Sequence, residues 1–317
     1  MSLRGREAPE ATLAPAGTLP GTARQGRCAP GASAGECWCD RMDDMGTWIS
    51  HLRIAEKLFE HLPELDEVTF TFGNLSPDSG IPNADWTEFD PPKEVAHFLR
   101  KGEGEDAIHD LEFYQQYLAD IKLEEDRKLY SFRLGYFFHL ICDIMWAKRI
   151  GKTTKQEFKE LFDENPGKAI GIVKDDWYGL DQLYVRDHPE SSFWRVIMAN
   201  PDPPSYLPFI KNEALHRQYA HIRKFYSEQE DYWFLSIPYR YLNKTTMSHM
   251  VDDSIEAVLF VQEKVREMKN LDGLKSSVSL LPEALTNPYE SPLGNTAPLP
   301  SPKSDWGSSD FGEGVTK

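Results

Sequence analysis

The stretch "GYFFHLICDIMW", residues 135–146, is an almost continuous apolar run that contains one histidine and one aspartate. Apolar side chains around the whole circumference of a helix indicate that the helix is buried. His139 and Asp143 are four residues apart, so on a helix their side chains point from the same face. An unpaired carboxylate in such a place would be costly or would take up a proton. The stretch therefore predicts a buried helix with either a core His–Asp hydrogen bond or a metal site.

Helical periodicity continues on both sides of this stretch. Residues 90–92, Asp-Pro-Pro, have the pattern of an N-cap followed by proline at the first helical position, which predicts a helix through Phe98. The best strand candidate is the short segment "EVTFTFG", residues 67–73. These patterns predict an all-α, single-domain fold of several helices. The other helices are expected at 52–62, 106–119, 128–150, 155–163, 190–199, 207–226 and 246–269.

The two ends of the chain differ from its middle in composition. Residues 1–44 are rich in Ala, Gly and Pro, and residues 271–317 are rich in Pro, Ser and Gly. Such compositions bury too little apolar surface to offset chain entropy, so both segments are expected to be disordered. The helical domain is expected at 45–270. The abrupt change at Met45 also suggests that synthesis starts there.

The net charge limits the classes of partner that are expected, and the cysteines indicate the compartment. The formal net charge of −16 argues against nucleic acid and against an anionic membrane surface. A phosphate-bearing substrate is still allowed, because a bound divalent cation can reverse the local charge. No apolar run approaches the roughly 20 residues of a transmembrane helix, and no secretory signal is recognisable. The cysteines lack the spacing of a zinc knuckle, so a reduced, cytoplasmic protein is expected.

Three further residues have side chains that suit a metal ion. His51 continues the apolar stripe of Leu52–Leu62, His97 lies near the end of the helix predicted after Asp90, and Asp78 lies in the turn "GNLSPDSG". Each has an ordinary structural interpretation: a core histidine, a helix-dipole partner and a turn residue, respectively. Together with His139 and Asp143 they make three imidazoles and two carboxylates, a mixed nitrogen and oxygen set that suits zinc.

The segments "MGTWISH", "GNLSPDSG", "VAHF" and "LGYFFHLICDIMW" resemble the zinc-dependent phospholipase C family, in an uncharacterised intracellular branch, over about residues 45–150. The resemblance implies an all-helical fold with a metal cluster in a cleft, where zinc-activated water attacks a phosphodiester. It implies a phosphoester small molecule or a lipid headgroup as substrate. It also assigns Asp143 as a bridge between two ions and Asp78 as general base. The metal ligands implied are His51, Asp78, His97, His139 and Asp143.

The chain departs from the family's three-zinc pattern after Asp143, because no histidine follows in "IMWAKRIGKTTKQEF". One or two zinc ions are therefore expected rather than three. Family members also use the mature amino terminus as a ligand; after removal of Met45, the amine of Gly46 would lie five residues from His51. Lys148 and Arg149 could contact a phosphate or be solvated charges at the helix end. The nearest substitute ligands are Asp175, Asp176, Asp181, His249 and Asp253.

Two other functions fit parts of the sequence. The dipeptide His109-Asp110 allows an HD-type phosphohydrolase, although this pair is expected in an acidic, exposed helix start. A helical binding or scaffold protein is the non-enzymatic alternative, with His and Asp as core polar pairs or as a structural metal site. The metal content of the purified protein distinguishes these alternatives.

Overall fold

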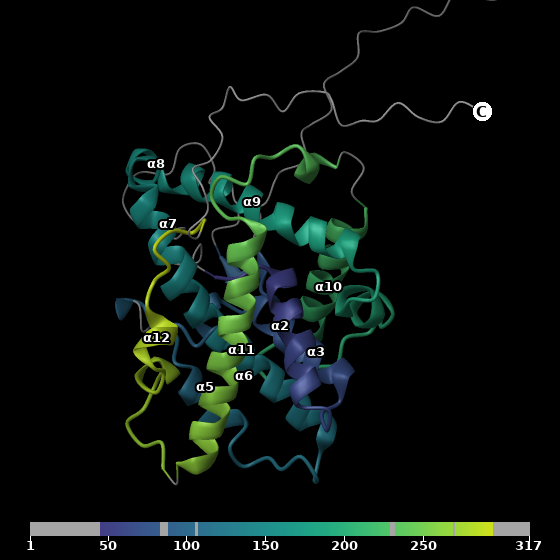
Figure 1. Ribbon diagram of the computed structural model, residues 1–317. Coiled ribbons are helices and arrows are strands. Elements are labelled where there is room, and N and C mark those ends of the chain that lie inside the picture. Colours follow the sequence, from purple (N-terminus) through teal and green to yellow (C-terminus); the bar gives the residue numbers. More distant parts are fainter. Residues whose placement is uncertain (1–44, 83–87, 105–106, 229–231, 269, 294–317) are drawn as a thin grey trace, which may run out of the picture.

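The computed structural model describes residues 45–82, 88–104, 107–228, 232–268 and 270–293 (Figure 1). The predictions for residues 1–44 and 294–317 fall outside these ranges. The described chain is mostly helical, which confirms the all-α class. None of its helices is both long and apolar enough to cross a bilayer.

The elements follow one another in a simple order along the chain. The helices are α2 (Trp48–His61), α3 (Glu67–Leu75), α4 (Lys93–Ala96), α5 (Asp110–Tyr117), α6 (Arg127–Trp146), α7 (Lys152–Glu157), α8 (Lys159–Glu164), α9 (Pro166–Asp187), α10 (Asn212–Ser227), α11 (Lys244–Glu267) and α12 (Glu283–Thr286). Shorter helical segments are the 3-10 turns η1 (Ser76–Asp78), η5 (Trp233–Leu235) and η6 (Ser277–Ser279) and the π-helical segments η3 (Ala147–Gly151) and η4 (Phe193–Met198). A short antiparallel pair joins β1 (Ile81–Pro82) to β2 (Phe89–Asp90).

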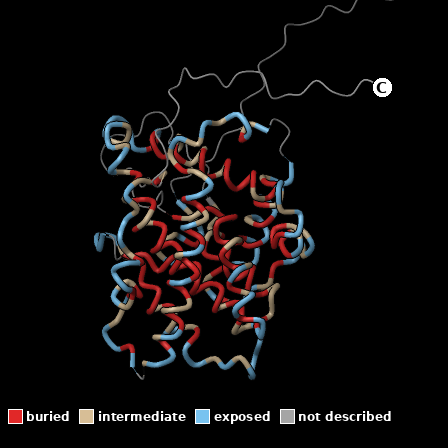
Figure 2. Tube along the Cα trace, in the orientation of Figure 1, coloured by how far each residue is buried: buried red, intermediate tan, exposed pale blue. Residues whose placement is uncertain are grey.

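Helix α6 is the central helix of the fold. Every residue from Leu134 to Trp146 is buried, as its apolar sequence predicted. It packs against α3, α5 and α11 (Figure 1), and the buried residues lie mainly in the middle of the molecule (Figure 2). Its start is fixed by Asp126, whose side chain accepts a hydrogen bond from the Leu129 amide at 3.0 Å. The pair His139 and Asp143 therefore lies in the middle of the core.

The strand expected at residues 67–73 is wrong, because these residues lie in helix α3. Its N-cap is Asp66, whose side chain accepts a hydrogen bond from the Thr69 amide at 3.0 Å. The alternation of Thr and Phe suggested a strand, but Phe70 and Phe72 are both buried because the helix is enclosed on several sides. A Cβ at Gly73 would collide with the carbonyl oxygen of Phe132, so glycine lets α3 approach α6 closely.

Helix α9 is a second departure, since no helix was expected at 166–187. Its start carries ordinary signals: the Asn165 side chain accepts a hydrogen bond from the Lys168 amide at 2.9 Å, and Pro166 is the first helical residue. The helix expected from Asp90 begins later, at Lys93, because Asp90 is paired with Ile81 in the β1–β2 ladder.

The helical domain, expected to end at residue 270, extends further along the chain. Leu271, Leu281 and Leu285 are buried, although Pro and Ser separate them in the sequence. The segment is also held by polar contacts, because Tyr289 donates a hydrogen bond to Asp253 at 2.6 Å. Residues 271–293 therefore belong to the packed body, and the disorder expected for them is wrong.

Candidate metal centre

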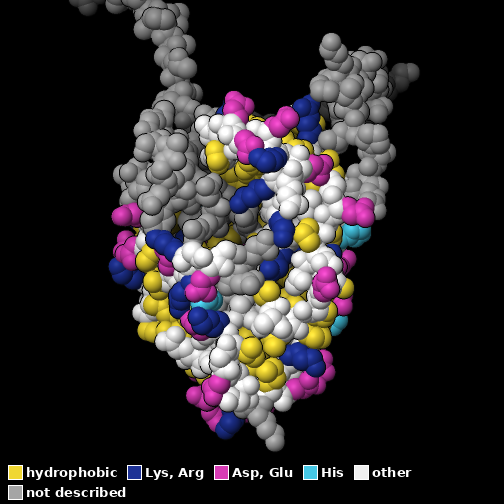
Figure 3. Space-filling view, turned by 90° about the vertical axis from the view of Figure 1, so that its left-hand side faces the viewer, with side chains coloured by type: hydrophobic (Ala, Val, Ile, Leu, Met, Phe, Trp, Pro, Cys, Tyr) yellow, Lys and Arg dark blue, Asp and Glu magenta, His cyan; other side chains and the backbone are white. Residues whose placement is uncertain are grey.

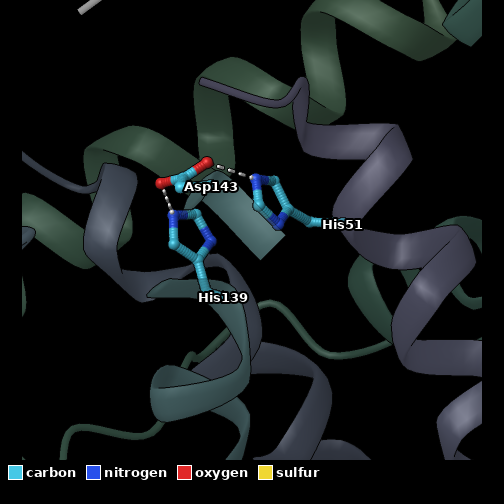
Figure 4. A group of neighbouring side chains, drawn as sticks. All are labelled: His51, His139 and Asp143. Carbon is cyan, nitrogen blue, oxygen red and sulfur yellow. Dashed lines mark ion pairs between the residues drawn. The ribbon is translucent and has the colours of Figure 1, made fainter. Parts of the chain in front are cut away.

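Four separate elements bring the five predicted ligands together. His51 lies in the first turn of α2, Asp78 ends η1, and His97 caps the C-terminus of α4. His139 and Asp143 lie one turn apart on α6, with His51 facing them across the interface (Figure 4).

The distances are short enough for shared metal ions. The two Asp143 oxygens face opposite partners: Oδ1 lies 3.2 Å from His51 Nε2, and Oδ2 lies 3.1 Å from His139 Nε2. His97 Nε2 lies 3.6 Å from Asp143 Oδ2 and 3.3 Å from Asp78 Oδ1. Two overlapping groups have ligand atoms within 4.8 Å of one another: His51, His139 and Asp143, and Asp78, His97 and His139. The sequence expectation that these side chains converge agrees with this geometry.

Several polar atoms of this centre lack the hydrogen bonds to the described residues that buried groups normally make. His51, His97, His139 and Asp143 are each 0% exposed. In the described part of the chain, the Nε2 atoms of all three histidines and Oδ2 of Asp143 have no hydrogen-bond partner of proper geometry. Orphaned buried polar atoms carry a desolvation penalty. A cation among them removes the penalty, so this donor set fits a zinc ion.

The charges of the centre depend strongly on one another. Burial alone would raise the pKa of Asp143, but His139 and His51 hold it well below its usual value. Burial alone would lower the pKa of His139, but the charge of Asp143 raises it. Burial, together with the charge of His139, lowers the pKa of His51, and burial lowers that of His97. An anionic Asp143 beside two imidazoles that favour the neutral form is the charge state that binds a metal cation.

Asn74 orients the central imidazole. Nδ1 of His139 lies 2.7 Å from the Asn74 carbonyl oxygen and donates a hydrogen bond to it, which directs Nε2 at Asp143. The Asn74 side chain in turn donates to the Gly135 carbonyl at 3.2 Å, which ties α3 to α6. The ring of His51 stacks on that of His139 with centroids 3.9 Å apart. Sequence reasoning missed Asn74, because its backbone oxygen makes the contact and any residue type carries one.

Gly46 lies directly at the centre. Its backbone amide donates a hydrogen bond to Asp143 Oδ1 at 3.2 Å. A Cβ at this position would lie 2.9 Å from His51 Nε2, which is closer than real Cβ atoms approach. The sequence placed the nitrogen of Gly46 near His51, and the structure places it there as a peptide amide. In that form it is a hydrogen-bond donor rather than a metal ligand.

Asp181 supports the start of α2 from outside the centre. Thr47, the N-cap of α2, donates its hydroxyl to Asp181 Oδ1 at 2.8 Å. Tyr226 donates to Asp181 Oδ2 at 2.6 Å. Burial raises the pKa of Asp181 to about 7, although both donors oppose the shift. Asp181 is therefore a buried carboxyl group satisfied by hydroxyls and does not belong to either group that could hold a metal ion.

The remaining substitute ligands also lie in other surroundings. Asp176 accepts hydrogen bonds from the amides of Tyr241, at 2.6 Å, and Leu242. His249 is exposed, and Asp175 is not a member of either metal-binding group. Asp253 pairs with the guanidinium of Arg149 at 2.6 Å. None of these residues completes the centre.

Arg149 and Lys148 do not project into solvent as helix-end charges. The Arg149 guanidinium lies 4.1 Å from the centroid of the Tyr289 ring, in addition to its pairing with Asp253. Lys148 is only 9% exposed. Arg149 therefore holds the C-terminal segment and is not placed to bind a phosphate.

The dipeptide His109-Asp110 lies in a different polar cluster. His109 is buried rather than exposed, with Nε2 2.6 Å from Glu103 and Nδ1 3.0 Å from Glu112. Asp110 accepts a hydrogen bond from the Ser277 amide at 2.8 Å. Neither residue joins the metal-binding groups found in the described chain, so the HD-type interpretation gains no support.

The comparisons with known proteins supply no further identification. No family model, no curated protein and no solved structure matches this chain. A functional assignment therefore depends on the geometry of the centre.

Proposed function

We propose that this chain is a metal-dependent phosphoester hydrolase of phospholipase C type, with one or two zinc ions in the centre of His51, Asp78, His97, His139 and Asp143. One observation carries the proposal: three imidazoles and two carboxylates converge, while the Nε2 atoms of the three histidines and Oδ2 of Asp143 have no well-formed hydrogen bond to any described residue. A cytoplasmic location, expected from the cysteine usage, is part of the proposal.

Asp143 would hold the metal together with the three histidines and Asp78. Its Oδ1 faces His51, whereas its Oδ2 faces His139 and His97. Asp78 lies 3.3 Å from His97 and would belong to the same set of ligands.

When bound, zinc would polarise a phosphoryl oxygen and lower the pKa of a water molecule. The protein supplies the proton acceptor. Asp78 is 14% exposed at its side chain, whereas the other four ligands are fully enclosed. Burial would raise the pKa of Asp78, but His97, His139 and Lys93 hold it below its usual value, so its carboxylate is ionised at neutral pH. Asp78 is the residue placed to take a proton from water that arrives from outside.

Elemental analysis combined with a substrate screen tests the proposal. Protein purified without chelator should contain about one or two equivalents of zinc. It should hydrolyse bis-p-nitrophenyl phosphate, p-nitrophenyl phosphate or a phospholipid headgroup, and chelation followed by zinc should remove and restore this activity. Asp78→Asn should lower kcat about 10²–10⁴-fold. Absence of transition metal, or no hydrolysis of any of the three substrates, contradicts the proposal.

The burial of the centre favours a second candidate, a non-catalytic helical protein with a structural metal site. Four of the five ligands are fully buried, which leaves little surface for a substrate. A structural site has no open coordination position. One tightly held zinc that stabilises the fold, without hydrolysis of any phosphoester, is the result expected for this candidate.

A further inference from the structure

The rim of the centre lies on the side of Asp78, because this is the ligand with exposed surface. A substrate that reaches the metal ions must pass this rim. The first question is therefore which charged groups stand beside Asp78.

Lys93 is placed there by helix α4. It is the first residue of α4, and its carbonyl accepts the His97 amide at 2.7 Å, so the two residues are one helical turn apart. Side chains four residues apart lie on the same face of a helix. Helix α4 also packs against η1, the turn that ends at Asp78.

A second set of contacts places the Lys93 ammonium independently. Its Nζ lies 5.3 Å from the centroid of the Phe89 ring. Phe89 in turn packs on the turn that follows Asp78, since a Cβ at Gly80 would stand 3.0 Å from Phe89 Cβ. These contacts thus bring a cation to the rim.

The same turn contains an unsatisfied donor. Ser79 follows Asp78 directly, is 1% exposed, and its hydroxyl has no hydrogen-bond partner among the described residues. A buried hydroxyl without a partner is unfavourable unless another group completes it.

We propose that Lys93 and the Ser79 hydroxyl form an anion subsite that holds a phosphoryl oxygen of the substrate beside the metal centre. The subsite rests on the proposed function and narrows it to anionic phosphoesters, monoesters or diesters, as opposed to neutral esters. Ammonium groups bind phosphate oxygens as point charges, and hydroxyls donate to them.

The negative net charge of the chain makes a local cation important for binding an anionic substrate. The formal net charge is −16, and on the face shown in Figure 3 Lys and Arg side chains are interspersed with Asp and Glu. Such a surface does not attract anions over a long range. A local ammonium at the rim offsets the repulsion where the substrate binds.

A purely structural role for Lys93 predicts a different outcome. If its ammonium only balances the charge of Asp78, removing it should tighten metal binding and leave anion binding unchanged. The deciding measurement is therefore phosphate affinity, with metal content as a second readout.

The experiment titrates inorganic phosphate into the full-length protein by calorimetry, with zinc added, for the wild type, Lys93→Gln, Lys93→Arg and Ser79→Ala. Lys159→Gln is the matched control, because Lys159 is 69% exposed and pairs only with the exposed Asp163 in the described chain. Loss of one charge-assisted contact in Lys93→Gln should raise the phosphate Kd about tenfold. Lys93→Arg should stay within about threefold of the wild type, Ser79→Ala should lose about threefold, and Lys159→Gln should not change.

Several outcomes overturn the subsite: no phosphate binding by the wild type, an equal Kd in Lys93→Gln, or an equal loss in Lys159→Gln. Melting temperatures and zinc content of the variants show whether the fold and the centre persist. If the protein takes up no zinc, the same titrations on the protein as purified decide the question by the same criteria.

The subsite and the proposed function can fail separately. Phosphate binding that depends on Lys93, without hydrolysis of any phosphoester, supports the subsite and contradicts the proposed enzymatic function. If the protein hydrolyses phosphoesters, and Lys93→Gln leaves both phosphate binding and KM unchanged, only the subsite is contradicted. In an active enzyme, Lys93→Gln should raise KM for bis-p-nitrophenyl phosphate.

Discussion

Helices α6 and α9 both carry buried carboxyl groups, but their surroundings differ in kind. On α6, Asp143 faces imidazole nitrogens that make no well-formed hydrogen bonds to it. On α9, Asp181 accepts hydroxyl protons from Thr47 and Tyr226. The histidines lower the pKa of Asp143, whereas burial raises that of Asp181 to about 7 despite its two donors.

The comparison shows that burial of an acid does not by itself indicate a metal site. A carboxyl group with fixed hydroxyl donors is complete without a cation and can stay protonated. A carboxylate facing several lone pairs is complete only when a cation or protons stand between them. What separates the two cases is the chemistry of the neighbours, and substitutions on each helix can test this.

The largest difference between the helices should appear on removal of metal. Zinc at about a thousandfold excess over Kd stabilises the native state by about 4 kcal/mol. Chelation should therefore lower the melting temperature of the wild type by about 10 °C. Asp143→Asn should lose most of this difference, because it removes the anionic group among the imidazoles.

Asp181→Asn is the matched control for this measurement, because it removes a buried carboxyl group away from the proposed zinc ligands. Its melting temperature should respond to chelation as that of the wild type does. Equal destabilisation of Asp143→Asn with zinc and with chelator would instead identify the His139–Asp143 pair as a core hydrogen bond, and the metal proposal would fail.

The second difference concerns pH. The folded pKa of Asp181, about 7, lies above its ordinary value of 3.8, so the folded state binds the proton more tightly. Stability from this group is present at low pH and is lost as pH rises from about 4 to about 7. In urea unfolding with chelator, Asp181→Asn should remove on the order of 2 kcal/mol of this decline.

Asp176 should contribute in the same direction over a narrower window, since burial raises its pKa to about 6. Asp143 should act oppositely: its pKa is lowered, so its contribution is lost only as pH falls below about 4. If the free energy of unfolding of the wild type is flat between pH 4 and 7 and unchanged in Asp181→Asn, the pKa values of both α9 carboxyl groups are not raised.

The smallest effect tests the link between α2 and α9 through Thr47. Thr47→Val removes the N-cap of α2 and one donor to Asp181, which should cost about 1–2 kcal/mol in urea unfolding. Zinc affinity should fall only severalfold, because Thr47 positions the start of α2 and is not one of the proposed metal ligands. Unchanged zinc affinity together with the expected loss of stability would show that the α9 contact supports the fold alone.

Some features of the centre could be expected from the sequence because they are local. His139 and Asp143 are four residues apart in an apolar helix, and His51 continues an apolar stripe. All three side chains are therefore expected to face the core. Others could not be expected. The contact of Asn74 with His139 uses a backbone oxygen, and Lys93 reaches the rim only because α4 packs on η1.

The sequence by itself determined the helical class and the buried helix α6, because hydrophobic periodicity acts within a few residues of chain. The tertiary structure alone decided that residues 67–73 are helical, since α3 approaches the backbone of α6 at Gly73. It also decided that residues 271–293 belong to the body and that Asp181 stays apart from the imidazoles. Each of these depends on contacts between residues far apart in the chain, which no local pattern records.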